Sequence, residues 1–586
     1  MIGSLVVAAA LGLQSSESVV RINQVGYRTD APKVAVVCSL AEERIGTFSV
    51  EDTTGRVVLP ATPARRAPGF GPCVVTHRLD FSAVRTPGRY RIVALTAAGA
   101  RVESPVVRVG DDVWRGGADT LLAYMRQQRS GYNPFFRDSV HRYDGIVVDG
   151  PKRGAYRPVS GGWADAADYL QYVTTSATAT YSMLLAHAEQ RAAFGDAHDA
   201  RGLPGANGIP DVVDEIRHGL EWLLRMFPTD DEMYNQLGDD RDHAYLDLPT
   251  TDSSDYGWGK GKERALYPCT GKPQGLFQHT NRATGMASTA GKYASTFARA
   301  ARELAPHDSA LARRLRERAI TAYEIGRRSP GVCQTAPGTS PYFYEEDNWV
   351  DDMELAAAEL LALTGDRAYA SQALAYATRE PVTPWMGADT AKHYQWYPWF
   401  NAGHYALWQH GNATERREAA AMYRTGLERL ASRADNGFRI GIPFIWCSNN
   451  LMAAAATQAM LYRRMTGDDR FRELEQAAID WLFGTNPWGV SMVVGYPRDG
   501  RWPRDPHSVV AMQLGAATQT GGLVDGPVYR SIYENLRGIN LHDGDEYARF
   551  NGGRMVYHDD RGDYSTNEPI MDGTANLMVV LALLAR

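Results

Sequence analysis

The sequence predicts a mainly α protein in which a small all-β unit precedes a large helical unit. In the first part of the 586-residue chain, short runs of alternating apolar and polar residues are separated by Gly, Pro and Asp, as in a β-sandwich. From Asp111 onward, apolar residues recur with a helical period as far as the C-terminus. We therefore place a sandwich at residues 19–109 and a helical unit at residues 110–586.

Four strands of the sandwich are predicted from the alternation of apolar and polar residues. They cover residues 34–38, 46–50, 73–77 and 90–94. Strands this short, with turn residues between them, suit a sandwich of about 90 residues.

The five cysteines are widely scattered, and no CxxC pair occurs, which argues against a structural zinc site. Cys38 and Cys73 both fall in the sandwich and are compatible with one disulfide, although nothing else in the sequence supports this pairing.

About twelve helices are predicted in the second unit. One opens at Pro210, with acidic residues near its positive end and an apolar face that includes Ile216 and Leu220. The others lie near residues 112–129, 168–189, 285–304, 309–328, 350–364, 367–379, 401–410, 413–432, 448–466, 470–484 and 573–585. Several connections between them are long, and loops of that length are usually functional.

Composition excludes some classes of function. The chain has 62 Lys and Arg against 68 Asp and Glu and no basic run, so we expect no nucleic-acid partner. Its aromatic residues are 30 Tyr, 13 Trp and only 16 Phe. Rings with a polar group suit a sugar-binding surface, but they also suit a large protein core, and composition leaves both interpretations open.

Residues 1–18 are a candidate signal peptide. The apolar run from Leu5 to Leu13 resembles the core of a secretory signal, although no Lys or Arg precedes it. No later segment has about 18 consecutive apolar residues, so we expect no membrane span. The expected location is secreted, periplasmic or extracellular.

Two carboxylates three residues apart lie in the segment GGWADAADY at residues 161–169. Asp165 and Asp168 follow a Gly-rich loop that leads into a predicted helix. Their spacing can direct both side chains at one water, and each raises the proton affinity of the other, as suits a general base. Alternatively, Asp165 is only the N-cap of the following helix.

Glu568 lies just before the C-terminal helix, in a segment that also contains Asp563 and Tyr564. A glutamic acid held among aromatic rings can have a raised pKa and deliver a proton. It can also be an acidic residue that merely suits a helix start. His507, in another long loop, could bond a substrate hydroxyl or serve a structural role.

Two further clusters allow two interpretations each. Trp396 and Trp399 belong to an aromatic cluster that could stack against sugars or pack in the core. Asp351 and Asp352 offer the hard oxygen ligands that Ca²⁺ takes, yet they also sit at a helix start. The acidic run at residues 239–243 is interpreted as a charged loop.

Together these segments resemble glycoside hydrolase family 9, the inverting cellulase family, preceded by its N-terminal immunoglobulin-like domain. Residues 161–169 resemble the family's GGW-x-DAGDY segment, and residues 563–568 its DY-x-x-NE segment. Asn486-Pro487 with Val494-Gly495-Tyr496 resembles its NP…GYG loop, and residues 20–27 resemble the first strand of the accessory domain. The resemblance implies a catalytic (α/α)6 barrel of twelve helices.

The resemblance also implies roles for individual residues. Asp168 would be the general base, Asp165 would help to hold the attacking water, and Glu568 would be the general acid. An inverting enzyme holds such carboxyl groups about 6.5–9.5 Å apart to leave room for the water. The residues expected to contact or shape the substrate site are Trp163, Tyr169, Trp396, Trp399, His507, Asp563 and Tyr564. No cofactor is required for this chemistry, and Asp351 and Asp352 would hold a structural calcium.

The expected function is inverting hydrolysis of a β-1,4-linked glucan. The family's His-His-Arg triplet is replaced by Pro506-His507-Ser508, and Ala164 and Ala167 replace its usual residues. These changes leave two alternatives open, an exo-acting enzyme on short β-linked oligosaccharides and a non-catalytic glycan-binding protein. The sequence indicates no oligomeric state.

Overall fold

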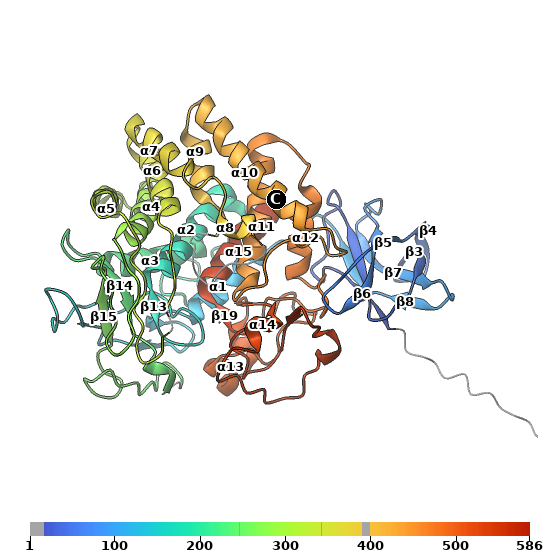
Figure 1. The fold of residues 1–586 in the computed structure, drawn as a ribbon, viewed down its shortest axis with the longest axis horizontal. Coiled ribbons are helices and arrows are strands. Elements are labelled where there is room, and N and C mark those ends of the chain that lie inside the picture. The colour runs from blue at the N-terminus through green and yellow to red at the C-terminus, as the bar shows by residue number, and fades with distance from the viewer. Residues whose placement is uncertain (1–16, 245–246, 342, 389–398, 586) are drawn as a thin grey trace, which may run out of the picture.

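A computed structural model describes residues 17–244, 247–341, 343–388 and 399–585 of the chain. Nearly all of the candidate signal peptide and the predicted sugar-binding Trp396 lie outside these residues. Figure 1 shows a β-sandwich at one side of a large helical body. No helix within the described ranges is long and apolar enough to cross a membrane.

The sandwich has two antiparallel sheets, and the predicted strands lie within β2, β3, β6 and β7. The first sheet has the order β1 (Ser18–Arg21), β2 (Val34–Ser39), β6 (Cys73–Asp80) and β5 (Arg65–Phe70). The second has the order β4 (Val57–Pro63), β3 (Ile45–Asp52), β7 (Gly88–Thr96) and β8 (Arg101–Glu103), and β9 (Val107–Val109) also pairs with β7. Val37, Phe48 and Ile92 belong to one buried cluster of this unit. A disulfide joins Cys38 to Cys73, so the pairing left open by the sequence is present.

Six helices form an inner ring, and most are buried nearly all round. They are α2 (Val173–Glu189), α4 (Ala287–Leu304), α6 (Val350–Thr364), α9 (Ala402–His410), α11 (Ser448–Thr466) and α15 (Met571–Leu584). Helix α15 has the sequence MDGTANLMVVLALL, and every one of its residues is buried. Such an apolar composition requires neighbours on all sides, and α15 indeed contacts α1, α2 and α11.

Six further helices pack outside this ring. They are α1 (Gly117–Gln127), α3 (Asp211–Met226), α5 (Ser309–Arg328), α7 (Arg367–Ala377), α10 (Ala413–Arg433) and α12 (Arg472–Leu482). Each packs mainly on one inner helix, in the order α15, α2, α4, α6, α9 and α11. Their one-sided burial, as at Leu315 and Ala319 of α5, is that of amphipathic helices. The twelve helices form the expected (α/α)6 barrel.

The long connections contain more regular structure than the sequence indicated. A four-stranded sheet has the order β12 (Ile146–Val147), β15 (Ala265–Pro268), β14 (Tyr234–Leu237) and β13 (Gln171–Tyr172). Three two-stranded ribbons pair β10 (Gly131–Asn133) with β11 (Asp138–Val140), β16 (Leu523–Val524) with β19 (Pro569–Ile570), and β17 (Val528–Tyr529) with β18 (Met555–Val556). The remaining described elements are the short helices α8 (Pro384–Gly387), α13 (Val509–Leu514) and α14 (Arg530–Tyr533) and four short 3-10 helices, one of which, Asp242–Ala244, lies in the loop after β14.

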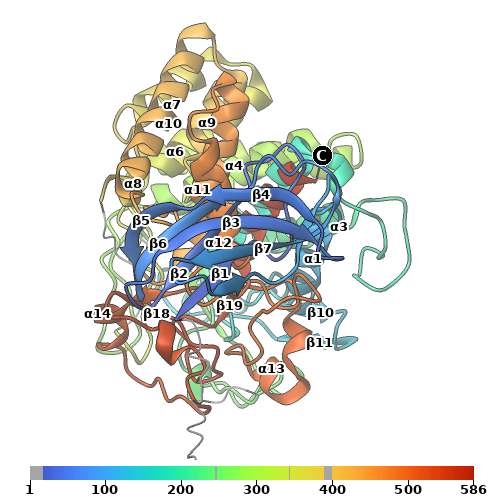
Figure 2. The ribbon, with the colours of Figure 1, turned by 90° about the vertical axis from the view of Figure 1, so that its right-hand side faces the viewer.

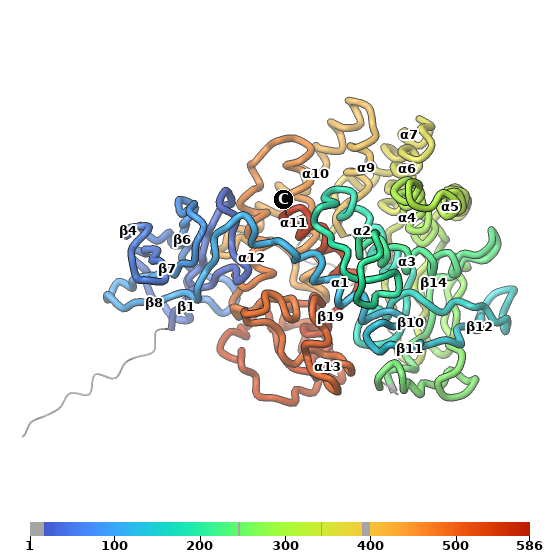
Figure 3. The backbone as a smooth tube through the Cα atoms, turned by 180° about the vertical axis from the view of Figure 1, so that it is seen from behind, coloured from blue at the N-terminus to red at the C-terminus, as the bar shows by residue number. Residues whose placement is uncertain are grey.

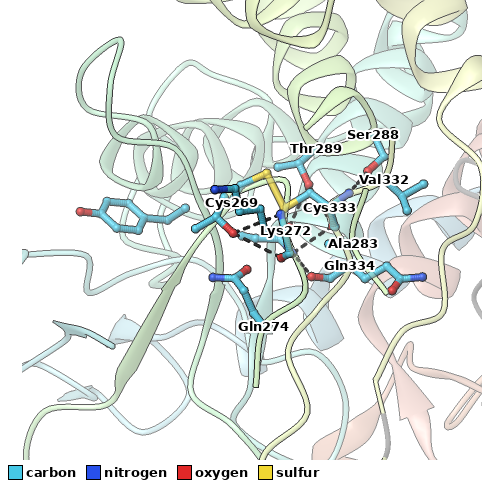
Figure 4. The surroundings of a disulfide bond; sticks show 12 residues. Cys269, Lys272, Gln274, Ala283, Ser288, Thr289, Val332, Cys333 and Gln334 are labelled. Atoms are coloured by element: carbon cyan, nitrogen blue, oxygen red, sulfur yellow. Dashed lines mark hydrogen bonds between the residues drawn. A yellow bond between two sulfur atoms is a disulfide. The ribbon is translucent and has the colours of Figure 1, made fainter. Parts of the chain in front are cut away.

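A second disulfide joins Cys269, which follows β15, to Cys333, which precedes α6. Figure 4 shows the bond among Ser288, Thr289 and Gln334. The backbone N–H of Cys333 donates to the Ser288 hydroxyl, and its carbonyl accepts from Asn235. The bond therefore fastens the small sheet to the segment that leads toward Tyr344.

The sandwich packs against the barrel rather than standing apart from it. Phe70 of β5 lies against Phe438, Phe444 and Trp481, with ring centroids 5.8, 5.9 and 6.0 Å apart. Figures 1 and 3 both place the sandwich beside α12, and Figure 2 shows it in front of the helices. The interface is therefore an extension of the barrel core.

Candidate active site

The loop before α2 and the loop before α15 meet at one end of the barrel. Because α2 and α15 are neighbours in the inner ring, the residues that precede them are brought together. The backbone N–H of Met571 donates to the carbonyl of Asp165 over 3.0 Å. The backbone N–H of Ala167 donates to Glu568 Oε1, also over 3.0 Å. Two segments 400 residues apart in sequence thus place three carboxyl groups in one site.

Asp165 is the more buried of the two aspartates, Asp165 and Asp168, in the loop before α2. Its Oδ1 accepts a hydrogen bond from the Thr175 hydroxyl, and its Oδ2 accepts one from the Tyr344 hydroxyl. Burial and the nearby charge of Asp168 raise the pKa of Asp165 to about 7, while the two hydroxyl groups act in the opposite direction. Both oxygens are occupied, so Asp165 is a fixed hydrogen-bond acceptor.

Asp168 is the accessible member, with 19% of its side chain exposed. Its Oδ1 accepts from the backbone N–H of Leu170 over 2.9 Å, and its Oδ2 lies 3.8 Å from His243 Nε2. Burial and the charge of Asp242 raise the pKa of Asp168 to about 7, and His243 opposes this rise. A carboxylate with that pKa can accept a proton near neutral pH.

His243 and Asp242 are site residues that the sequence analysis missed, since it interpreted their segment as a charged loop. His243 Nδ1 lies 2.9 Å from Asp242 Oδ1. Burial disfavours the imidazolium, but the hydrogen bond and charge of Asp242 outweigh it and raise the pKa of His243 to about 10. A cation therefore faces Asp168. The only sequence signal was a histidine directly after an aspartate inside a long loop.

Glu568 has the opposite electrostatic setting. Burial, with the charges of Asp525 and Asp168, raises its pKa well above the usual range for a glutamic acid. One backbone hydrogen bond, from Ala167, acts against this rise. The protonated form of Glu568 is therefore favoured, as suits a group that donates a proton.

Three rings lie near the acid. Tyr564 is tilted by 34° against Trp446, with centroids 5.4 Å apart, and His507 lies 6.2 Å from Tyr564. Nδ1 of His507 donates to the Arg561 carbonyl over 2.6 Å, and burial lowers the pKa of His507. The ring is therefore neutral, with a lone pair on Nε2 that can accept from a sugar hydroxyl. All three rings are partly exposed, and the sequence analysis had not selected Trp446.

Four predicted substrate contacts are corrected, because these side chains have little or no accessible surface. Trp163 is fully buried and donates its indole N–H to Glu215 over 2.7 Å. Trp399 is 1% exposed, and Tyr169 is 6% exposed and donates its hydroxyl to the Asp247 carbonyl. Asp563 is fully buried and accepts bonds from His558, Ser565 and Thr566. These residues support the walls of the site.

The expected calcium ligands, Asp351 and Asp352, have protein partners in this structure. Lys292 Nζ lies 2.7 Å from Asp352 Oδ1 and also bonds Glu346, so an ammonium group already neutralises this buried cluster. Asp351 accepts from the Asn348 side chain over 2.8 Å. Within the described ranges, no three His, Cys, Asp or Glu side chains are placed to hold a metal. A structural calcium stays a prediction, and no step below depends on it.

Comparisons with known proteins agree with this geometry. The family model of glycosyl hydrolase family 9 matches residues 116–581, and that of the cellulase N-terminal ig-like domain matches residues 15–98. Endoglucanase C of Cellulomonas fimi is 28% identical over 527 residues, covering 81% of this chain and 44% of that protein. Cellulose 1,4-beta-cellobiosidase of Acetivibrio thermocellus is 23% identical, covering 84% and 61%. The chain thus spans less than two thirds of either relative.

A solved structure extends the similarity to the whole described fold. The crystal structure of a metagenome-derived glycoside hydrolase family 9 endoglucanase superposes with a TM-score of 0.73 at 27% identity. The alignment covers 97% of this chain and 99% of that one. Both the sandwich and the barrel are therefore shared.

Proposed function

The chain belongs to glycosyl hydrolase family 9, and on that premise we propose that it hydrolyses β-1,4-linked glucan with inversion at the anomeric carbon. The observation that carries this proposal is that two carboxyl groups in one site have different charged neighbours. His243 favours the charged form of Asp168, whereas burial and neighbouring carboxylates favour the protonated form of Glu568. One group can accept a proton while the other donates one.

On the base side, Asp168 removes a proton from water as the water attacks the anomeric carbon. Its exposed carboxylate is the one that water can reach, while Asp165 and Tyr344 fix the neighbouring wall. The imidazolium of His243 favours the charged form of Asp168 and so limits the rise in its pKa.

On the acid side, Glu568 gives its proton to the glycosidic oxygen as the bond to the anomeric carbon breaks. The rings of Trp446 and Tyr564 offer partly exposed aromatic surface nearby, which suits contact with the apolar face of a sugar. His507 Nε2 can accept a hydroxyl hydrogen of the substrate.

The stereochemistry of the first product tests this proposal. Proton NMR during hydrolysis of a defined β-1,4-gluco-oligosaccharide should show the α-anomer first, before mutarotation. A β-anomer as the first product would contradict inversion. Binding without any turnover, across cellulose, mixed-linkage glucan and xyloglucan, would instead support a non-catalytic glycan-binding protein.

A second candidate, exo-action on short oligosaccharides, is favoured by one bridge beside the site. Gln513 of α13 donates to Asp247 Oδ1 over 2.7 Å, and the Tyr169 hydroxyl donates to the Asp247 carbonyl. This contact joins the segment that carries His243 to the segment that carries His507. Such a bridge would restrict one end of a cleft. Early products from cellohexaose distinguish the candidates, since a single small product indicates exo-action and mixed oligomers indicate endo-action.

We further propose that the protein acts outside the cytoplasm. Two disulfides, Cys38–Cys73 and Cys269–Cys333, are expected to persist in an oxidising compartment. A polymeric glucan substrate would also be encountered outside the cytoplasm. Free-thiol counting on protein recovered from the culture medium tests this, because one reactive thiol after unfolding is expected.

A further inference from the structure

Asp525 is a buried acid that the mechanism above does not use, and it lies directly behind Glu568. It follows β16, whose Val524 pairs with Pro569 of β19 in antiparallel register. The next opposed pair is Asp525 and Glu568, and the backbone N–H of Asp525 donates to the Glu568 carbonyl over 3.0 Å. Opposed residues in such a ladder point to the same face, with Cβ atoms about 5 Å apart. The two carboxyl groups are therefore neighbours.

The carboxyl of Asp525 is held by donors on both oxygens. Trp446 Nε1 donates to Oδ2 over 2.8 Å, and Cys447 Sγ donates to Oδ1 over 3.1 Å. Asp525 and Cys447 have no exposed surface. Both donors are neutral, so they stabilise an anion without cancelling its charge. Burying a charged carboxylate in this way costs free energy. This cost points to a functional role for Asp525.

Other titratable groups surround the pair. Asp572 and Asp563 act on Asp525, and Asp168 and His243 act on Glu568. The Tyr124 hydroxyl, also near both acids, donates to the Pro569 carbonyl over 2.7 Å. Only His243 among these named groups is cationic, and it lies on the side of Asp168. Repulsion between two adjacent carboxylates therefore disfavours the state in which Asp525 and Glu568 are both charged, so at least one of them holds a proton.

The hydrogen bonds decide which acid keeps that proton. Asp525 accepts from two side-chain donors, each of which favours its charged form. Glu568 accepts one backbone bond, from Ala167. Burial raises the pKa of both groups, and the donors on Asp525 lower its pKa in part. The two donors on Asp525 therefore favour the negative charge on Asp525 and the proton on Glu568.

We propose that Asp525 is a positioning residue that keeps the catalytic proton on Glu568, with Cys447 and Trp446 holding its carboxylate in the charged form. This inference rests on the proposed role of Glu568 as the general acid. The protons balance, because Glu568 gives one to the glycosidic oxygen, Asp168 takes one from the attacking water, and exchange with solvent restores both groups.

The replacement Asp525→Asn tests the proposal, since the amide keeps the size and one acceptor but removes the charge. Glu568 should then lose its proton at lower pH, so the alkaline limb of kcat/KM should move down by about one pH unit or more. Asp480→Asn is the matched control, because Asp480 is also buried and accepts from amide donors, of Asn23 and Gln476, but lies under the sandwich. The alkaline limb of kcat/KM should not move in Asp480→Asn.

An unmoved or upward-shifted limb in Asp525→Asn would overturn the inference. If Asp525→Asn does not fold, Cys447→Ala and Cys447→Ser replace it, both at the same left-handed backbone position. The alanine variant, which lacks a donor, should lose about fivefold or more in kcat at unchanged KM, whereas serine should retain activity. Equal activities in the two variants would also overturn it. Retained hydrolysis in Glu568→Gln would refute the proposed function itself, so the two failures are distinguishable.

Discussion

The base side and the acid side of the site each contain a carboxyl group with a raised pKa, but the partners of the two groups differ. Asp168 faces the imidazolium of His243, which opposes the rise and leaves the pKa of Asp168 at about 7. Glu568 faces Asp525, whose donors are neutral, so its protonated form is favoured. This difference indicates that the charge of the nearest partner, rather than burial alone, determines which carboxyl group acts as the acid and which as the base.

Removing either carboxylate should have the largest effect. Glu568→Gln and Asp168→Asn should each lower kcat by about 10²–10⁴-fold, because each removes one proton-transfer group. Circular dichroism should show an intact fold. Glu428→Gln, on the exposed face of α10, is the control and should retain full activity. Comparable activity in Glu568→Gln and the control would refute the assignment of the acid.

Removing the cation should make the base side resemble the acid side. In His243→Gln the pKa of Asp168 should rise, because the imidazolium favours its charged form. Asp168 would then be protonated up to a higher pH, and the acidic limb of kcat/KM should move upward by about one unit. Measuring the pH profile checks the sign. His198→Gln breaks a similar histidine–aspartate pair, 2.6 Å from Asp211, and should leave the limb in place.

Removing one hydrogen bond to Asp165 should have the smallest effect on kcat. Tyr344→Phe removes one of the two hydroxyl groups that bond Asp165, and kcat should fall by about tenfold. The alkaline limb, which reports Glu568, should stay where it is. Tyr323→Phe, which removes a similar bond to Gln372 between α5 and α7, should leave kcat unchanged. A larger loss than in Asp168→Asn would contradict the supporting role of Asp165.

Much of the fold followed from local pattern. The alternating runs predicted four of the nine strands of the sandwich, and the helical periods predicted all twelve barrel helices with errors of up to five residues at their ends. The small sheet β12–β15–β14–β13 was missed because its strands are two to four residues long and separated by long loops. Strands that short have too little alternation to be recognised.

The candidate site was predicted in part. The motifs located Asp165, Asp168 and Glu568, and the structure brings them together at one end of the barrel. The sequence did not separate aromatic residues of the site from those of the core. Trp163 and Trp446 look alike in sequence, yet only Trp446 is partly exposed. Burial depends on which helix covers a ring, and that is a property of packing.

The β unit, the twelve helices and the loop positions of the three carboxyl groups follow from the amino-acid order, because all of these depend on neighbours along the chain. The different settings of the carboxyl groups arise only in the folded chain. Asp242 and His243 reach Asp168 from about 75 residues away, and Asp525 reaches Glu568 across a two-stranded ribbon. Proton affinity depends on charges and donors within a few ångströms in space, and only the folded chain brings them there.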